Sequence, residues 1–324
     1  MWNWQQADWP HFSYDLADQA ALEARFLHQA GVLLGVAKHI PVSEKNRLAA
    51  ELLSEEALKT SAIEGEYLNR DSLRSSILKH FGLVHEHRKI PPREAGIAAL
   101  MLNLYETYST PLTHTMLFNW HRMLTNDRID LQAIGRYRIH PEPMQIISGS
   151  VGHPKVHFEA PPSSQVKPAM NAFIKWFNNT APQKKDALSP LIRAAITHLY
   201  FVSIHPFEDG NGRLARALAL KSLFQNLGLA ELIALSHTIE KHKKNYYKKL
   251  DENNKSLAIT EWLSYFSETI LAAQQYTLEL LEFLVNKAKF YDVFKKRLNE
   301  RQLKVIERLF REGPEGFAGG LSAF

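Results

Sequence analysis

The sequence predicts an all-α protein, a mainly helical body that carries one β-hairpin. Through most of the 324 residues, apolar side chains recur at the spacing of helices that bury one face. Strand signals are sparse outside residues 136–160, where short alternating apolar stretches flank glycine and proline. Hydrophobic residues make up 45% of the chain and charged residues 23%, which is typical of a soluble globular protein with one large domain or two smaller ones.

The first helix is expected over residues 15–38, where apolar positions from Leu16 to Leu33 follow the helical period. A second helix is expected over 43–60, with Ser43 as its N-cap. The same periodicity predicts the remaining helices over 71–81, 91–108, 113–124, 165–179, 187–204, 212–227, 240–251, 255–287 and 288–311.

The hairpin is expected to join Met144–Ile147 to Val156–Phe158 through a turn at Ser148–Pro154. A lone two-stranded hairpin is only marginally stable in water. We therefore expect it to rest on the helical body and to cover part of it.

We divide the chain into three parts. Residues 1–80 form an N-terminal helical region, 90–285 form the core, and 288–324 hold a basic amphipathic helix followed by the Gly/Pro-rich GPEGFAGG. The last part is predicted to open a small further domain.

Composition excludes several kinds of site. The chain has no cysteine, which rules out disulfides, a cysteine nucleophile and a thiolate zinc site, and is compatible with the cytoplasmic location that we expect. The net charge of +5 suits an anionic ligand but is too small for a nucleic-acid footprint. The first 18 residues lack the pattern of a signal peptide, and we see no membrane span.

The segment that carries chemistry is His205–Arg216, with the sequence HPFEDGNGRLAR, between two predicted helices. Gly210 and Gly212 around Asn211 permit positive φ angles, so successive backbone amides can form an anion nest. The start of the following helix adds free N–H groups and the positive end of its dipole.

The charged side chains of this segment complete a phosphate site. Arg213 and Arg216 share a helix face and offer two guanidinium groups to a polyphosphate. Asp209 supplies the hard carboxylate oxygen that Mg²⁺ prefers. His205 is the residue able to take a proton near neutral pH, as a general base. Each feature alone is more often structural; together they supply the parts of one phosphate-transfer site.

The segment resembles the Fic motif, His-x-Phe-x-(Asp/Glu)-Gly-Asn-Gly-Arg-x-x-Arg, at every defined position. The resemblance extends over roughly 90–285 and implies a helical Fic core whose hairpin, the flap, aligns a target segment by strand addition. It further implies ATP bound with Mg²⁺, with His205 as general base and Asp209 as metal ligand. Phosphate contacts are implied for Gly210, Asn211, Gly212, Arg213 and Arg216.

A second motif lies upstream, where Thr60, Glu64 and Gly65 match the pattern (Ser/Thr)-x-x-x-Glu-(Gly/Asn) of Fic proteins with an inhibitory helix. Alone, this stretch is an ordinary helix end followed by a C′ glycine. The resemblance implies that Glu64 pairs with Arg216 and keeps it from the γ-phosphate of ATP.

Three other segments are less informative. The start of the chain, MWNWQQADWPHFSYD, is expected to pack on the core, and resembles the domain of unknown function that precedes many bacterial Fic cores. The lysine-rich run 241–254 is expected to be a solvated helix face, although in Fic proteins an aromatic side chain here lies near the adenine, which implicates Tyr246 or Tyr247. The C-terminal helix resembles the first helix of a winged-helix domain.

The leading hypothesis is transfer of AMP from ATP to a Ser, Thr or Tyr hydroxyl of a protein, autoinhibited by Glu64. The alternatives are removal of AMP at the same site, with Glu64 orienting a water, transfer from another nucleotide, and a DNA-binding regulator with a Fic sensor core. DNA is expected as a partner only if the C-terminal helix is part of a complete winged-helix domain. The protein could also form a homodimer. The target protein and the net direction of the reaction do not follow from the sequence.

Overall fold

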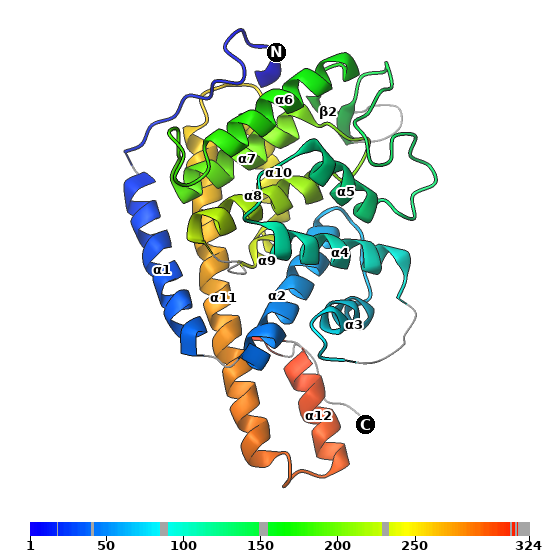
Figure 1. The fold of residues 1–324 in the computed structure, drawn as a ribbon, viewed down its shortest axis with the longest axis vertical. Coiled ribbons are helices and arrows are strands. Elements are labelled where there is room, and N and C mark those ends of the chain that lie inside the picture. The colour runs from blue at the N-terminus through cyan, green and yellow to red at the C-terminus, as the bar shows by residue number, and fades with distance from the viewer. Residues whose placement is uncertain are drawn as a thin grey trace.

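The computed structural model describes residues 1–17, 19–39, 42–84, 90–148, 155–228, 233–311, 313, 314 and 316. Most of the predicted hairpin turn and of the Gly/Pro-rich tail lies outside the described residues. The described part holds twelve α-helices and, at their edge, a single two-stranded antiparallel sheet (Figure 1). This confirms the predicted all-α fold with one hairpin. None of the described helices combines the length and the apolar character needed to cross a membrane.

Two antiparallel neighbours, α7 (Pro190–Ile204) and α8 (Asn211–Leu227), form the centre of the body. Both are buried on nearly every face, because apolar and small residues surround their axes. Proline in the first turn of α7 suits a helix start, since its missing N–H has no partner there in any case. The helices α4 (Pro92–Thr107), α5 (His114–Leu124) and α6 (Ser163–Asn179) pack around this pair.

The N-terminal region is part of the same body. It comprises the 3₁₀ turn η1 (Asn3–Gln5) and the helices α1 (Gln19–His39), α2 (Val42–Ile63) and α3 (Arg70–His80). Helix α1 lies along α11, and α2 packs against α3, α4 and α9 (Figure 1). Phe26, Ala57 and Ile63 are fully buried members of the main hydrophobic cluster, so α1 and α2 share one core with the central helices.

The last third of the chain departs from the predicted boundaries. A short helix α9 (Leu235–Lys241), too brief for periodicity to show, precedes α10 (Lys243–Asn253). The predicted break at 288 is wrong: α11 runs unbroken from Thr260 to Phe294, because no glycine or proline interrupts it there. Helix α12 (Glu300–Arg311) then folds back and packs Phe310 against Phe290 and Tyr291.

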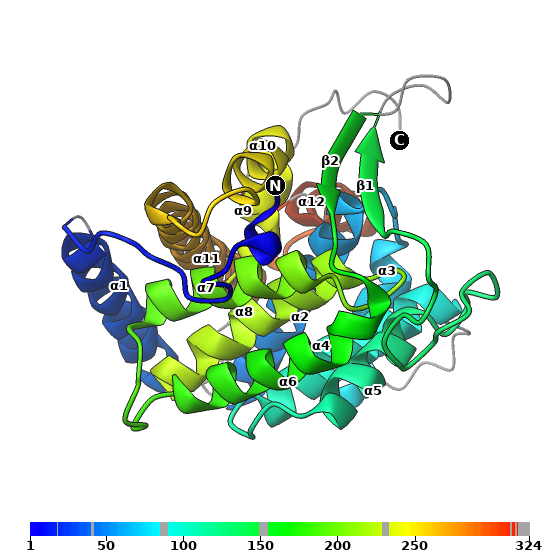
Figure 2. The ribbon, with the colours of Figure 1, turned by 90° about the horizontal axis from the view of Figure 1, so that it is seen from above.

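The hairpin pairs β1 (Gln145–Ser148) with β2 (Lys155–Glu159), with an irregularity between Ile146 and Ile147. It projects beyond the helical body, with the N-terminus beside β2 (Figure 2). Strand β1 is exposed at every position, whereas β2 buries Phe158 to 4% exposure. The hairpin therefore rests on the body through β2.

Candidate active site

His205 ends α7 in the left-handed region, with φ of 50° and ψ of 60°. That conformation is uncommon for a residue with a side chain and has to be held by its surroundings. The His205 amide donates to the Phe201 carbonyl at 3.1 Å, and Arg138 Nε donates to the His205 carbonyl at 2.8 Å. The Arg138 amide also donates to the Pro206 carbonyl at 3.0 Å, so one residue holds the chain on both sides of the turn.

The imidazole of His205 is set up to accept a proton. Its Nδ1 lies 3.3 Å from the Val202 carbonyl, and because a carbonyl only accepts, Nδ1 carries the hydrogen. Nε2 is then the basic nitrogen. Burial, followed by the positive charge of Arg138, lowers the pKa of His205 to about 4, so the ring is neutral at pH 7.

The loop after His205 is closed by its own side chains. Phe207 is fully buried and stacks on His121, with 4.2 Å between ring centroids. The Asn211 side chain accepts from the Phe207 amide at 3.0 Å and donates to the Phe207 carbonyl at 2.8 Å. The side chain of Asn211 therefore shapes the loop, and a phosphate contact from this residue is left to its backbone amide.

The two glycines of the motif serve different needs. Gly210 precedes α8 with φ of 81°, the positive angle for which glycine is suited. Gly212 lies inside the helix, and a Cβ there would stand 2.3 Å from Glu64 Oε1. The reason for glycine at 212 is thus space for an approaching carboxylate and not a positive φ angle.

Arg216 contacts the residues of the upstream motif. Its side chain is 1% exposed; Nε donates to Thr60 Oγ1 at 2.7 Å, and Nη2 donates to the Thr60 carbonyl at 2.9 Å and to Glu64 Oε1 at 2.7 Å. Burial opposes the charge of Arg216, but the Glu64 carboxylate holds its pKa above the ordinary value. The structure contains the predicted contact between Glu64 and Arg216.

A second glutamate of the same turn contacts the other arginine. After α2, Gly65 adopts φ of 84°; its amide donates to the Ala62 carbonyl and the Glu66 amide to the Ser61 carbonyl, each at 3.0 Å. This is a Schellman turn. It directs Glu66 Oε2 to Arg213 Nη1 at 2.6 Å, where the Arg213 side chain is 5% exposed. The sequence reasoning missed Glu66, although a second carboxylate just past the matched glycine was a visible signal.

Asp209 stands among three donors. Its Oδ1 accepts from the Gly210 amide at 2.6 Å, and its Oδ2 pairs with Arg128 and lies 3.6 Å from Arg213 Nη2. Burial alone would raise the pKa of Asp209, but these positive neighbours more than offset it and keep the pKa below its ordinary value. Arg128 was not anticipated, because it lies far from the motif in sequence.

The donor set suits one kind of metal. Among the residues that the structure describes, no three His, Cys, Asp or Glu side chains cluster as a metal site. A single carboxylate beside the predicted phosphate site fits Mg²⁺, which takes most of its ligands from phosphates and water. Asp209 would have to leave Arg128 to serve in this way.

The two tyrosines of α10 are separated by the fold. Tyr246 is 1% exposed, and its hydroxyl lies 3.0 Å from His198 Nε2 in the core. Tyr247 is 40% exposed, and its hydroxyl donates to the Ile63 carbonyl at 3.2 Å and to Glu64 Oε2 at 3.4 Å. The predicted contact with a base is therefore unavailable to the buried ring of Tyr246 and remains a prediction for Tyr247.

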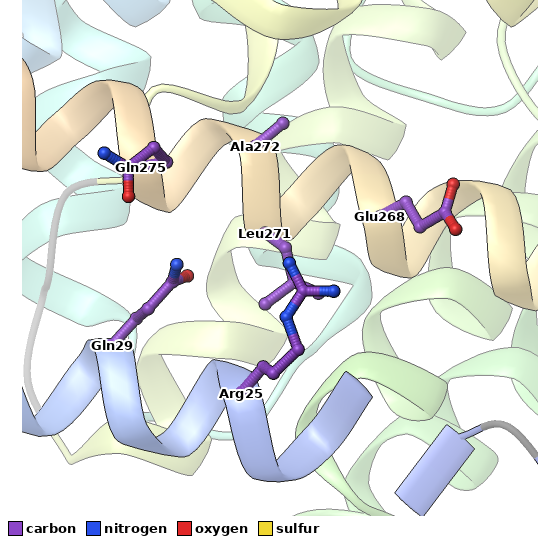
Figure 3. A pocket seen from close by; sticks show the side chains of 6 residues that line it. All are labelled: Arg25, Gln29, Glu268, Leu271, Ala272 and Gln275. Atoms are coloured by element: carbon purple, nitrogen blue, oxygen red, sulfur yellow. The ribbon is translucent and has the colours of Figure 1, made fainter. Parts of the chain in front are cut away.

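A cavity of about 360 Å³ lies elsewhere, between α1 and α11 (Figure 3). No motif residue lines it; the lining residues are Arg25, Gln29, Glu268, Leu271, Ala272 and Gln275. This cavity is therefore separate from the α7–α8 loop.

Comparisons with known families match two parts of the chain. Residues 2–83 match a domain of unknown function (DUF4172), and residues 111–223 match the Fic/DOC family. The second match contains the whole of α7, the loop and most of α8.

Several named proteins are similar over part of the chain. The "protein adenylyltransferase Fic" of Nematostella vectensis is 26% identical over 199 residues, which cover 60% of this chain and 42% of that protein. The "protein adenylyltransferase fic-1" of Caenorhabditis elegans is 27% identical over 199 residues, which cover 60% of this chain and 35% of that protein. A "uridine 5′-monophosphate transferase" of Xanthomonas campestris is 41% identical over 71 residues, 21% of this chain and 13% of that protein. The chain thus spans less than half the length of these relatives.

Solved structures share the fold. A Fic family protein from Desulfovibrio desulfuricans superposes with a TM-score of 0.59 at 23% identity, covering 79% of this chain and 74% of that one. Fic-1 from C. elegans superposes with a TM-score of 0.56 at 20% identity, covering 82% of this chain and 74% of that one. The chain therefore carries a Fic/DOC domain at residues 111–223, with a DUF4172 domain ahead of it at residues 2–83.

Proposed function

We propose that this protein transfers AMP from ATP to a Ser, Thr or Tyr hydroxyl of another protein, and that Glu64 holds it inactive. The observation that carries the proposal is the place of the Glu64 carboxylate. It lies at the start of α8, against Gly212 and Arg216, where backbone amides and a guanidinium favour negative charge. A site that accepts this carboxylate has the charge and the space to accept a phosphate in its place.

The transfer step uses the neutral imidazole. His205 Nε2 takes the proton of the incoming hydroxyl as its oxygen bonds to the α-phosphorus, and the bond from that phosphorus to the bridging oxygen breaks, releasing pyrophosphate. The amides of the loop, Arg213 and Arg216 bind the phosphates and stabilise the charge that builds on them. Asp209 would hold Mg²⁺, which when bound neutralises phosphate charge.

The hairpin is proposed to align the target, and its contacts indicate which strand is used. The carbonyls of His157 and Glu159, on the outer side of β2, already accept hydrogen bonds from Asn254 and Trp4. Strand β1 is exposed along its length. An extended target segment would therefore pair with β1.

Inhibition is proposed to act on both arginines. Glu64 forms an ion pair with Arg216, and Glu66 forms one with Arg213. The chain therefore places its own carboxylates where the phosphates of ATP would bind. The Schellman turn at Gly65 directs both glutamates to α8. A small movement of this turn would free both arginines together.

The experiment compares labels and donors. Incubation of the Glu64→Gly protein with cell lysate and ATP labelled at the α-phosphate should label proteins, whereas with γ-labelled ATP the enzyme should add nothing to the label that kinases of the lysate incorporate without it. Labelled UTP belongs in the same experiment, because one relative is named for transfer of UMP. Incorporation of γ-label that depends on the added enzyme would refute nucleotidyl transfer, and incorporation from UTP alone would change the donor.

Removal of AMP is a second candidate, favoured by one observation. Among the residues that the structure describes, Glu64 Oε2 accepts a single long hydrogen bond of 3.4 Å, from Tyr247, and the glutamate side chain is 29% exposed. That oxygen has the capacity to orient a water. Release of labelled AMP from a premodified protein by the parent, and its loss in Glu64→Gly, would favour this reaction over addition.

A further inference from the structure

The outer edge of β2 is capped by side chains from three separate parts of the chain. Asn254 Nδ2 donates to the His157 carbonyl at 3.0 Å, Trp4 Nε1 donates to the Glu159 carbonyl at 2.7 Å, and Arg138 Nη2 donates to the Pro161 carbonyl. The three carbonyls alternate along the chain. They face away from β1, because the intervening Ala160 amide donates to Met144 across the hairpin.

The N-terminal segment connects this edge to α7. Asn3 is fully buried, and its Nδ2 donates to Ser203 Oγ at 2.8 Å, two positions before His205. The Asn3 amide donates to the Asn254 carbonyl at 2.8 Å. Asn3 and Trp4 are neighbours in η1, so this short turn binds the strand on one side and the end of α7 on the other.

Packing strengthens the same connection. The rings of Trp2 and Phe158 meet edge to face, with 5.4 Å between centroids, and Phe158 is the buried anchor of β2. Arg138 makes a parallel link, since its guanidinium bonds both the Pro161 carbonyl and the His205 carbonyl. The position of β2 relative to His205 is thus set by side chains outside the hairpin.

We propose that η1, the first part of the DUF4172 domain, is a brace that positions the flap over His205, with Trp4 and Asn3 as positioning residues for the target hydroxyl. The inference rests on the proposed function, in which a segment paired with the hairpin delivers its hydroxyl to the imidazole. A general base acts only on a group within hydrogen-bond reach, so a hairpin that tilts on the body would lower the rate without touching the phosphate site.

The test uses Trp4→Phe, which keeps an aromatic ring and removes the N–H donor to Glu159. Ser203→Ala breaks the brace from the α7 side. Trp120→Phe is the matched control, because its indole donates to Asn103 at 2.7 Å between α4 and α5, away from the hairpin. Hydrogen exchange of the hairpin is measured by mass spectrometry, MgATP affinity by calorimetry, and label transfer from α-labelled ATP to lysate proteins in a Glu64→Gly background.

Trp4→Phe and Ser203→Ala should each raise amide exchange in the hairpin by about two- to tenfold, the factor that corresponds to one net hydrogen bond. Transfer should fall by a similar factor while MgATP affinity stays within about twofold, and Trp120→Phe should leave both hairpin exchange and transfer at the parent level. Unchanged exchange in the hairpin, or raised exchange with an unchanged transfer rate, would overturn the proposal. If Glu64→Gly itself transfers no label, the proposed function fails, and the exchange experiment still decides whether η1 braces the hairpin.

Discussion

Glu64→Gly is the change that tests the candidate site most directly. The substitution removes one charged hydrogen bond of 2.7 Å from an arginine that is 1% exposed. Arg216 keeps its two bonds to Thr60, so the guanidinium should stay where it is and regain a free face. The space beside Gly212 opens at the same time, since Glu64 Oε1 lies 2.3 Å from where a Cβ of that glycine would be.

The size of the effect follows from this geometry. A hydrogen bond between charged partners contributes about 1.5–3 kcal/mol, and this one has a buried arginine on one side and a partly exposed glutamate on the other. If about 2–3 kcal/mol separates the closed from the open site, removal of the carboxylate should raise the transfer rate by roughly 30- to 160-fold.

Self-labelling with α-labelled ATP at saturating concentration is the assay, because it needs no knowledge of the target. Glu64→Gly combined with Arg216→Ala should lose the gain, and this non-additivity is the sign of direct coupling. Glu240→Gln is a matched control. It removes the 3.2 Å ion pair that joins Lys59 of α2 to Glu240 of α9, and it leaves the contacts of Arg216 unchanged. A Glu64→Gly protein no faster than the parent, or an equal gain in Glu240→Gln, would refute the reasoning.

His205→Ala should abolish transfer, and calorimetry should show an unchanged affinity for MgATP. The transfer rate of the parent should fall only as the pH drops toward about 4, because the pKa of His205 is lowered to about 4 and a protonated imidazole cannot act as a base. Asp209→Ala should remove the difference in ATP affinity between Mg²⁺ and EDTA; a parent that shows no such difference would contradict a metal role. Ile146→Pro should reduce transfer to protein more than ATP binding, because it removes a ladder donor of the hairpin; a loss confined to ATP binding would count against that role. Glu66→Gln should tighten MgATP binding by about fivefold or more by releasing Arg213, and equal affinity would show that this ion pair does not compete with nucleotide.

The motif could be predicted from sequence because its parts are contiguous. His205, Asp209 and Gly210 act within one loop between two helices, so their spacing already determines their neighbours. The long apolar helices were predictable for a similar reason, since α7 and α8 show their burial in their own composition.

What could not be predicted depends on contacts between distant segments. Arg138 holds the backbone of His205 from the segment before the hairpin, and nothing in its local sequence shows this. The side chain of Asn211 closes the loop and Gly212 leaves space for Glu64, and a glycine-rich pattern does not reveal either contact. The phosphate contacts expected of these two residues stay predictions. Tyr246 and Tyr247 are adjacent on one helix and therefore point in different directions, and only the fold shows which one faces the core.

The common core has a consequence for how the two matched domains behave. The matches at 2–83 and 111–223 mark two separate sequence domains. Nevertheless Phe26, Ala57 and Ile63 of the first domain lie in one buried cluster with residues of the second domain. A protein cut between these matches would expose apolar surface on both pieces, so neither is an independent folding unit. Detachment of α2, the helix that precedes the proposed inhibitory glutamate, would then amount to partial unfolding. Release of the proposed inhibition would need only a local rearrangement of the few residues around Gly65, which leaves α2 in the core.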